Sequence, residues 1–125
     1  MREPIRDKGR LEHILSSIDN IFDFADGKSI TDLSDNKMLF FAVVKNIEII
    51  GEAAHKLTDA FKNQHQEVPW PYIIKMRHVL VHDYYQISVR EVWKVIREDL
   101  GPLRQQIASY LSDTDWNVWT TTETS

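Results

Sequence analysis

The sequence lacks cysteine and contains few of the residues that interrupt helices. It has no cysteine, four glycines and four prolines in 125 residues. The absence of cysteine excludes a disulfide framework, a thiolate metal site and a cysteine nucleophile. The scarcity of glycine and proline leaves few positions at which a long helix has to end. A chain of this length is expected to form one domain.

Long apolar runs are also missing. No stretch approaches the ~20 apolar residues that a membrane-spanning helix needs, and residues 1–4 carry no apolar run of signal-peptide type. The net charge of −4 argues against a protein that coats nucleic acid through many phosphate contacts. Residues 75–104 are nevertheless net positive, which leaves room for a local anion site. We expect a cytoplasmic protein without membrane contact.

Apolar residues recur at helical spacing along most of the chain. This spacing predicts four helices, near residues 5–26, 36–61, 70–81 and 88–111. The second helix is apolar on two faces, which indicates a central helix with neighbours on both sides. The fold class expected is therefore all-α, an up-and-down bundle of four to five helices.

Local signals mark the ends of these helices. Gly27 is placed to end the first one in the left-handed conformation, and Ser88 with Glu91 is placed to cap the last one. Gly101-Pro102 is expected to kink that last helix without ending it. The helical period stops after Leu111, so we expect a domain over residues 1–111 and a flexible tail over residues 112–125.

The segment from Met76 to Tyr85 concentrates side chains that are suited to phosphate chemistry. It contains Arg77, His82 and Tyr84 in the spacing Arg, four residues, His, one residue, Tyr. An arginine binds phosphate as a permanently charged fork, and a histidine transfers protons near neutral pH. Arg77 and His82 would point about 140° apart on a continuous helix. They therefore converge on one phosphate only at a helix end or with help from a second chain.

This motif and its flanking segments resemble the HEPN-domain family, and within it the HepT-like ribonuclease toxins. The family signature is Arg, four to six residues, His, often followed by X-Tyr. The resemblance covers roughly residues 5–111, and three further segments carry it: Ile50-Gly51-Glu52-Ala53, Val68-Pro69-Trp70 and Val92-Trp93. The chain departs from the family at His78, where most members have asparagine.

The resemblance implies a metal-independent endoribonuclease that acts as the toxin of a toxin–antitoxin pair. It implies a homodimer whose shared cleft holds Arg77, His82 and Tyr84 of both protomers, with His78 and Tyr84 positioning the RNA. It also implies a partner nucleotidyltransferase that silences the toxin by transferring AMP to Tyr84. Tyr85 is the rival acceptor. No cofactor is expected for this chain.

Two alternatives remain open at this point. His78 and His82 are four residues apart, a spacing that lets two imidazoles bind one metal ion with an oxygen from Asp83. No further ligand is near them in the sequence, so we favour a site without metal. The second alternative is a non-catalytic helical interaction or nucleotide-binding module that acts through an operon partner. Trp70 and Trp93 are expected in the core, whereas Glu52 could partner Arg77 or a backbone donor, or reach solvent.

Overall fold

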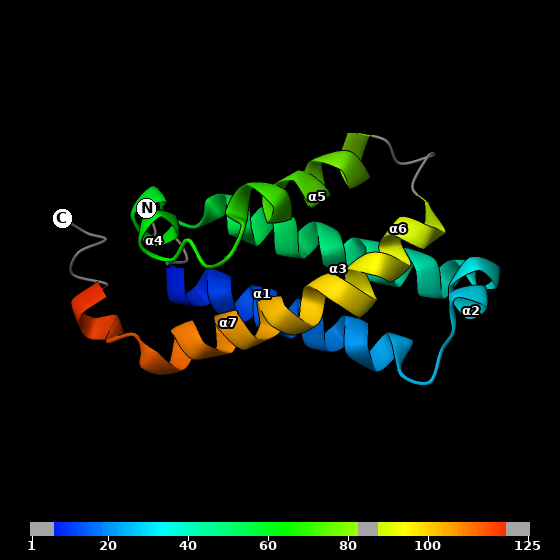
Figure 1. The fold of residues 1–125 in the computed structure, drawn as a ribbon, viewed down its shortest axis with the longest axis horizontal. Coiled ribbons are helices and arrows are strands. Elements are labelled where there is room, and N and C mark those ends of the chain that lie inside the picture. Colours follow the sequence, from blue (N-terminus) through cyan, green and yellow to red (C-terminus); the bar gives the residue numbers. More distant parts are fainter. Residues whose placement is uncertain (1–6, 83–87, 120–125) are drawn as a thin grey trace, which may run out of the picture.

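A computed structural model describes residues 7–82 and 88–119, and over residues 78–82 it describes the backbone alone. The described residues form helices and no strand, which confirms the all-α prediction (Figure 1). In chain order the elements are α1 (Asp7–Ala25), α2 (Ile30–Asp35), α3 (Lys37–Lys56), α4 (Asp59–Gln64), α5 (Trp70–His82), α6 (Val89–Lys94), the π-helical segment η2 (Val95–Asp99) and α7 (Leu100–Asp113). Within these ranges no helix is long and apolar enough to cross a membrane.

Helix α3 is the central element of the bundle. It packs against α1 along one side and against α5 along another, while α7 lies on α1 (Figure 1). Its buried side chains include Val43, Ile47, Ile50 and Ala54. The two apolar faces expected from the sequence therefore each meet a neighbouring helix, since burial of both faces is what stabilises such a helix in water.

The first connection contains more helix than the sequence predicts. Gly27 ends α1 with a φ of 70°, as expected. Ser29 then opens α2 with a capping box, in which it exchanges hydrogen bonds with Asp32. Asn36 separates α2 from α3 and caps α3 by accepting a hydrogen bond from the Leu39 amide. Asn36 thus ends one helix and starts the next without a loop.

The predicted second helix divides near its end. It was expected to reach Phe61, but α3 stops at Lys56 because Leu57 adopts an extended backbone conformation. Thr58 then caps α4, and its hydroxyl oxygen accepts a hydrogen bond from the Phe61 amide. The apolar period continues across the break because Leu57 and Phe61 are both buried in the same core.

The last predicted helix is continuous from Val89 to Asp113 and comprises α6, η2 and α7. Its irregular segment lies just before the kink expected at Gly101-Pro102. The five residues of η2, immediately before Leu100, are π-helical. Pro102 has no backbone N–H and its ring needs space beside the preceding turn. A π-helical turn widens the helix at that place, so the chain accommodates Pro102 without ending the helix.

The segment after α7 differs from the flexible tail that the sequence predicts. Residues 116–119 form a helical turn, and the ring of Trp116 stacks on Phe61 with centroids 6.3 Å apart. Trp119 is buried, and its indole N–H donates to Asp7 Oδ2 at 2.8 Å. The two tryptophans therefore complete the aromatic end of this chain's own core.

Candidate functional site

The candidate site is built on the crossing of α3 and α5. Gly51 of α3 lies against the backbone of Arg77, because a Cβ added to Gly51 would come within 3.0 Å of the Arg77 nitrogen and 3.1 Å of its Cα. No side chain fits in that space. The absence of a side chain at Gly51 is therefore what allows α5 to approach α3 at Arg77.

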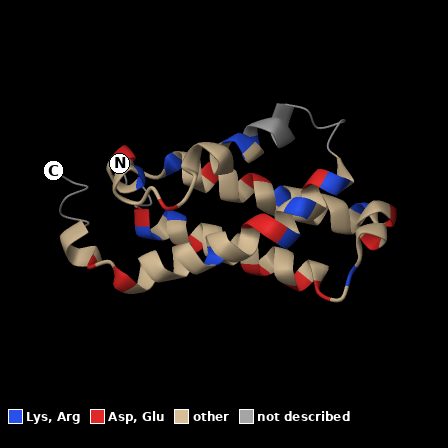
Figure 2. Ribbon diagram, viewed as in Figure 1, with Lys and Arg blue, Asp and Glu red and all other residues tan. Residues whose placement is uncertain are grey.

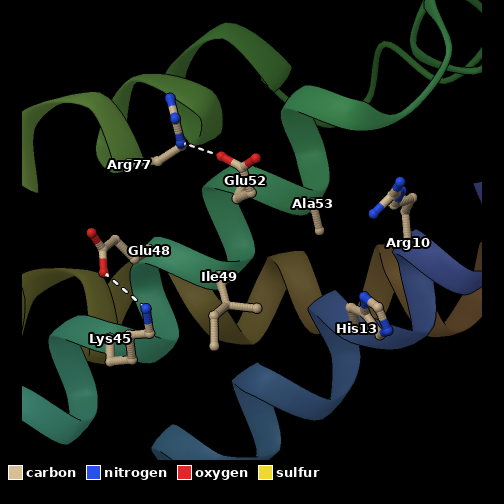
Figure 3. Close-up of a pocket in the computed structure, with 8 residues that line it drawn as sticks. All are labelled: Arg10, His13, Lys45, Glu48, Ile49, Glu52, Ala53 and Arg77. Atoms are coloured by element: carbon tan, nitrogen blue, oxygen red, sulfur yellow. Dashed lines mark ion pairs between the residues drawn. The ribbon is translucent and has the colours of Figure 1, made fainter. Parts of the chain in front are cut away.

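The residue after Gly51 holds the Arg77 side chain. Glu52 Oε1 lies 2.5 Å from Arg77 Nε, and Glu52 Oε2 lies 3.2 Å from Lys56 Nζ (Figure 3). The hydrogen bond from Lys56, followed by the charges of Arg77 and Lys56, holds the pKa of Glu52 below its usual range, although partial burial opposes this shift. The sequence left the role of Glu52 open, and the structure identifies it as the ion-pair partner of Arg77.

The guanidinium of Arg77 remains available to a ligand. Its side chain is 33% exposed, and Glu52 engages it through Nε. Glu52 is its one ion-pair partner among the residues that the structure describes. Because an arginine fork binds phosphate through parallel N–H donors, the terminal nitrogens of Arg77 suit a phosphate oxygen. The Gly51-Glu52 pair thus sets both the position and the orientation of this side chain.

His82 is the last residue of α5, so the helix continues through the whole interval from Arg77. Five residues at 100° each place the two positions about 140° apart around the helix axis. The helix does not end between them, and the residues after His82, close to where the sequence predicts the helix to end, lie outside the part of the chain that the structure describes. The side chains of His78 and His82, and all of Asp83, Tyr84 and Tyr85, lie outside the described residues. The possible metal pair and the predicted acceptor tyrosine therefore lie outside them as well.

Arg77 also lines a cavity of about 300 Å³ that the sequence did not predict. The cavity lies along one stripe of α3 and is bordered by α1 (Figure 3). Its lining residues are Arg10, His13, Lys45, Glu48, Ile49, Glu52, Ala53 and Arg77. The sequence analysis did not single out Arg10 and His13. Their spacing of three residues, which places them on one face of α1, is the sequence feature that could have indicated them.

Figure 2 shows acidic residues interspersed with the basic residues of the described helices. Three cations of residues 75–104 form ion pairs with carboxylates: Arg77, Lys94 and Arg104. Arg104 contacts Asp19 through two nitrogens, at 2.6 and 3.3 Å, and Lys94 lies near Glu98 and Asp99. Asp99 also accepts a hydrogen bond from the Tyr72 hydroxyl, which raises the pKa of Tyr72 to about 12. Ion pairing therefore reduces the positive charge of this segment, and Arg77 is the cation of the segment that lines the candidate site.

The tryptophans flanking the motif serve the core. Trp70 is buried and donates its indole N–H to the His65 carbonyl at 2.8 Å. Trp93 is half-buried, and Arg97 lies over its ring at 5.8 Å from the centroid. The structural role predicted for Trp70 is confirmed, and Trp93 packs at the edge of the core. Neither ring lines the cavity beside Arg77.

Comparison with known proteins agrees with this arrangement. A family model described as "Ribonuclease HepT-like" matches residues 14–110. "Probable ribonuclease HepT" of Thermococcus cleftensis is 37% identical over 97 residues, which cover 78% of this chain and 88% of that protein. "Putative RNase TTE0752" of Caldanaerobacter subterraneus subsp. tengcongensis is 35% identical over 101 residues, which cover 81% and 90%.

A longer relative shows the same segment within a larger protein. "Gamma-glutamylcyclotransferase and putative RNase MJ0434" of Methanocaldococcus jannaschii is 33% identical over 107 residues, or 86% of this chain. The match spans 48% of that relative, so this chain corresponds to about half of its length. No solved structure matches this chain significantly.

Proposed function

Because this chain belongs to the HepT-like ribonuclease family, a branch of the HEPN proteins, we propose that it is an endoribonuclease that cleaves RNA without a metal ion. The observation that carries the proposal is the position of Arg77. Gly51 admits its backbone, Glu52 binds its Nε, and a partly exposed fork remains beside a cavity. Such a fork, five residues before a histidine, suits the stabilisation of a phosphodiester undergoing displacement.

In the proposed reaction the RNA supplies its own nucleophile. The 2′-oxygen attacks the adjacent phosphorus while the bond from phosphorus to the 5′-oxygen breaks. The products are a 2′,3′-cyclic phosphate and a 5′-hydroxyl. His82 accepts the proton from the 2′-hydroxyl, or donates one to the leaving 5′-oxygen, and Arg77 stabilises the charge that builds on the phosphate oxygens.

The separation of Arg77 and His82 on α5 favours a homodimer. Two groups about 140° apart on one helix do not readily reach the same phosphorus. A two-fold axis beside α5 would set the Arg77 of one protomer opposite the His82 of its partner. In this arrangement His78 and Tyr84 border the shared cleft and position the RNA strand.

Tyr84 is also the proposed point of control. A nucleotidyltransferase encoded next to this chain would transfer AMP to the Tyr84 hydroxyl, with ATP as the donor and pyrophosphate as the leaving group. The added phosphate would offset the charge of Arg77, and the nucleoside would fill the cleft. This chain would then be the toxin of a toxin–antitoxin pair, and its partner would be the antitoxin.

The cleavage proposal is tested with purified protein, mixed RNA and a metal chelator. We expect cleavage in the presence of chelator and products ending in 2′,3′-cyclic phosphate. His82→Ala should lower the rate by about 10²–10⁴-fold, because a general acid–base catalyst is lost. His55→Ala is the matched control, since His55 is an exposed histidine of α3 outside the cavity. Products with 5′-phosphate ends would contradict the mechanism, and RNA binding without cleavage would favour the non-catalytic alternative.

The control proposal is tested by co-expression with a neighbouring nucleotidyltransferase gene. Mass spectrometry of the purified chain should show AMP on Tyr84 and on no other residue. Tyr84→Phe should then stay active beside the partner, whereas Tyr85→Phe should be silenced like the wild type. A silenced complex with unmodified Tyr84 would mean that the partner inhibits by binding alone.

A further inference from the structure

The cavity beside Arg77 contains two cations, Arg10 and Lys45, that have no part in the reaction described above. Arg10 of α1 lines this cavity together with His13, on the side of α3 that faces α1 (Figure 3). Ile49 and Ala53 of α3 are the apolar residues of the cavity lining, which also includes Arg10 and Arg77. At about 300 Å³ the cavity is at the lower end of the range for small-ligand pockets.

Arg10 differs from the other cations of the cavity because no carboxylate among the described residues pairs with it. Arg77 pairs with Glu52 at 2.5 Å, and Lys45 lies 3.8 Å from Glu48. The Nε of Arg10 is buried and has no hydrogen-bond partner among the described residues. A buried N–H donor without an acceptor is unfavourable, and one attached to a charged group more so. An anionic ligand that enters the cavity would remove this cost.

The charges of the cavity favour an anion over a neutral or cationic ligand. Its lining contains three basic side chains, Arg10, Lys45 and Arg77, against two carboxylates, Glu48 and Glu52, and both carboxylates are already paired. His13 adds an imidazole that can donate a hydrogen bond. A guanidinium matches phosphate in geometry as well as charge, so the anion class that fits Arg10 best is a phosphate.

We propose that Arg10, assisted by His13, forms a second phosphate subsite that binds the RNA phosphodiester next to the one held at Arg77. The inference rests on the proposed ribonuclease function, because Arg77, which would bind the phosphate that is cleaved, lines the same cavity as Arg10. Single-stranded RNA carries one phosphate per nucleotide, and proteins that bind it follow its backbone with a positively charged groove. Ile49 and Ala53 would lie beneath the nucleoside that connects the two phosphates.

The experiment measures binding in the absence of cleavage. A fluorescent single-stranded RNA is titrated by anisotropy into the His82→Ala protein, with and without Arg10→Gln, over a range of salt concentrations. We expect Arg10→Gln to weaken binding by about ten-fold, since one charge-assisted hydrogen bond is lost. The slope of log affinity against log salt should fall in magnitude by about 0.7, the value for one phosphate contact on a single strand.

Lys8→Gln is the matched control, because it removes one positive charge from an exposed residue of the same helix. Lys8 is two residues from Arg10, which places it about 200° around the helix and off the cavity. Arg10→Lys should recover most of the salt slope. Equal effects of Arg10→Gln and Lys8→Gln would overturn the proposal. If Arg10→Gln fails to fold, His13→Gln must weaken binding more than Lys8→Gln does, and equal effects would overturn the proposal in the same way.

Two further outcomes separate this inference from neighbouring ones. A 5′-mononucleotide that binds as tightly as the RNA would assign the cavity to a free nucleotide and overturn the RNA subsite. Wild-type protein that binds RNA through Arg10 but cleaves none would refute the proposed function and support the subsite. Cleavage by the wild type together with an Arg10→Gln variant of unchanged affinity would refute the subsite and leave the function intact.

Discussion

Gly51 of α3 is in direct contact with the backbone of Arg77 on α5, with no space between them for even a methyl group. The next residue, Glu52, binds the Arg77 side chain. A Gly-Glu pair on one helix therefore fixes both the backbone and the guanidinium of an arginine on another. This gives a physical reason for a glycine in the middle of a helix, where glycine is otherwise unfavourable.

Gly51→Ala should destabilise the fold and displace the site. The added methyl group would overlap the Arg77 backbone, and such overpacking typically costs about 1–3 kcal/mol. Urea unfolding measures this change. Gly101→Ala is the control, because Gly101 is also helical and a Cβ there meets nothing within 4 Å. That variant should be neutral or up to about 1 kcal/mol more stable. Equal stabilities of the two variants would show that the α3–α5 contact is looser than described.

Glu52→Gln should change how stability depends on pH. The pKa of Glu52 is lowered in the folded state, so its ionised form stabilises the protein above the unfolded pKa of about 4.5, and this contribution is lost as pH falls through the folded value. The difference in urea midpoint between wild type and variant should therefore be present at neutral pH and shrink below pH 4.5. Lys56→Gln should remove much of the same pH dependence, since Lys56 is the main cause of the shift. Parallel pH curves for wild type and Glu52→Gln would contradict this account.

Two inactive variants should complement each other if the site is shared between protomers. In a mixed dimer of Arg77→Ala and His82→Ala, one of the two clefts regains both an arginine and a histidine when the pair comes from opposite chains. We expect mixing and re-equilibration of the two variants to restore part of the ribonuclease activity. Each variant alone, treated in the same way, is the control. Full inactivity of a verified mixed dimer would place Arg77 and His82 of one chain in the same cleft.

Trp119 should contribute to the stability of the fold, although it is distant in sequence from its contacts in α1 and α4. Its ring is packed on Phe61 at a centroid distance of 5.6 Å, and it donates to Asp7, which also accepts from the Thr58 amide and hydroxyl. Trp119→Ala should lower the free energy of unfolding by about 3–5 kcal/mol, as for other buried aromatics.

Two variants refine that measurement. Trp119→Phe retains an aromatic ring, although a smaller one, and removes the N–H that donates to Asp7, so it should cost less, about 1–3 kcal/mol. Met38→Ala, at a side chain that is 84% exposed, should change stability by less than about 0.5 kcal/mol. A Trp119→Ala protein as stable as Met38→Ala would show that the segment after α7 does not belong to the folded core.

The sequence by itself determined the features that depend on neighbours along the chain. Helical period, the left-handed Gly27 and the start of α5 before Arg77 all follow from residues within one or two turns. The resemblance to the HEPN family likewise follows from ordered motifs, and the family match confirms it.

Only the tertiary structure decided the features that depend on residues distant in sequence. Thr58 breaks the predicted second helix where Asp7, 51 residues earlier, accepts two of its hydrogen bonds. Trp119 was expected in a flexible tail, but it is buried in the core, where its indole N–H donates to the same Asp7 carboxylate. Arg10 meets the cavity beside Arg77 because α1 and α5 both pack on α3. Helical periodicity tells which face of each helix is buried, but the neighbour that it meets depends on how the helices cross.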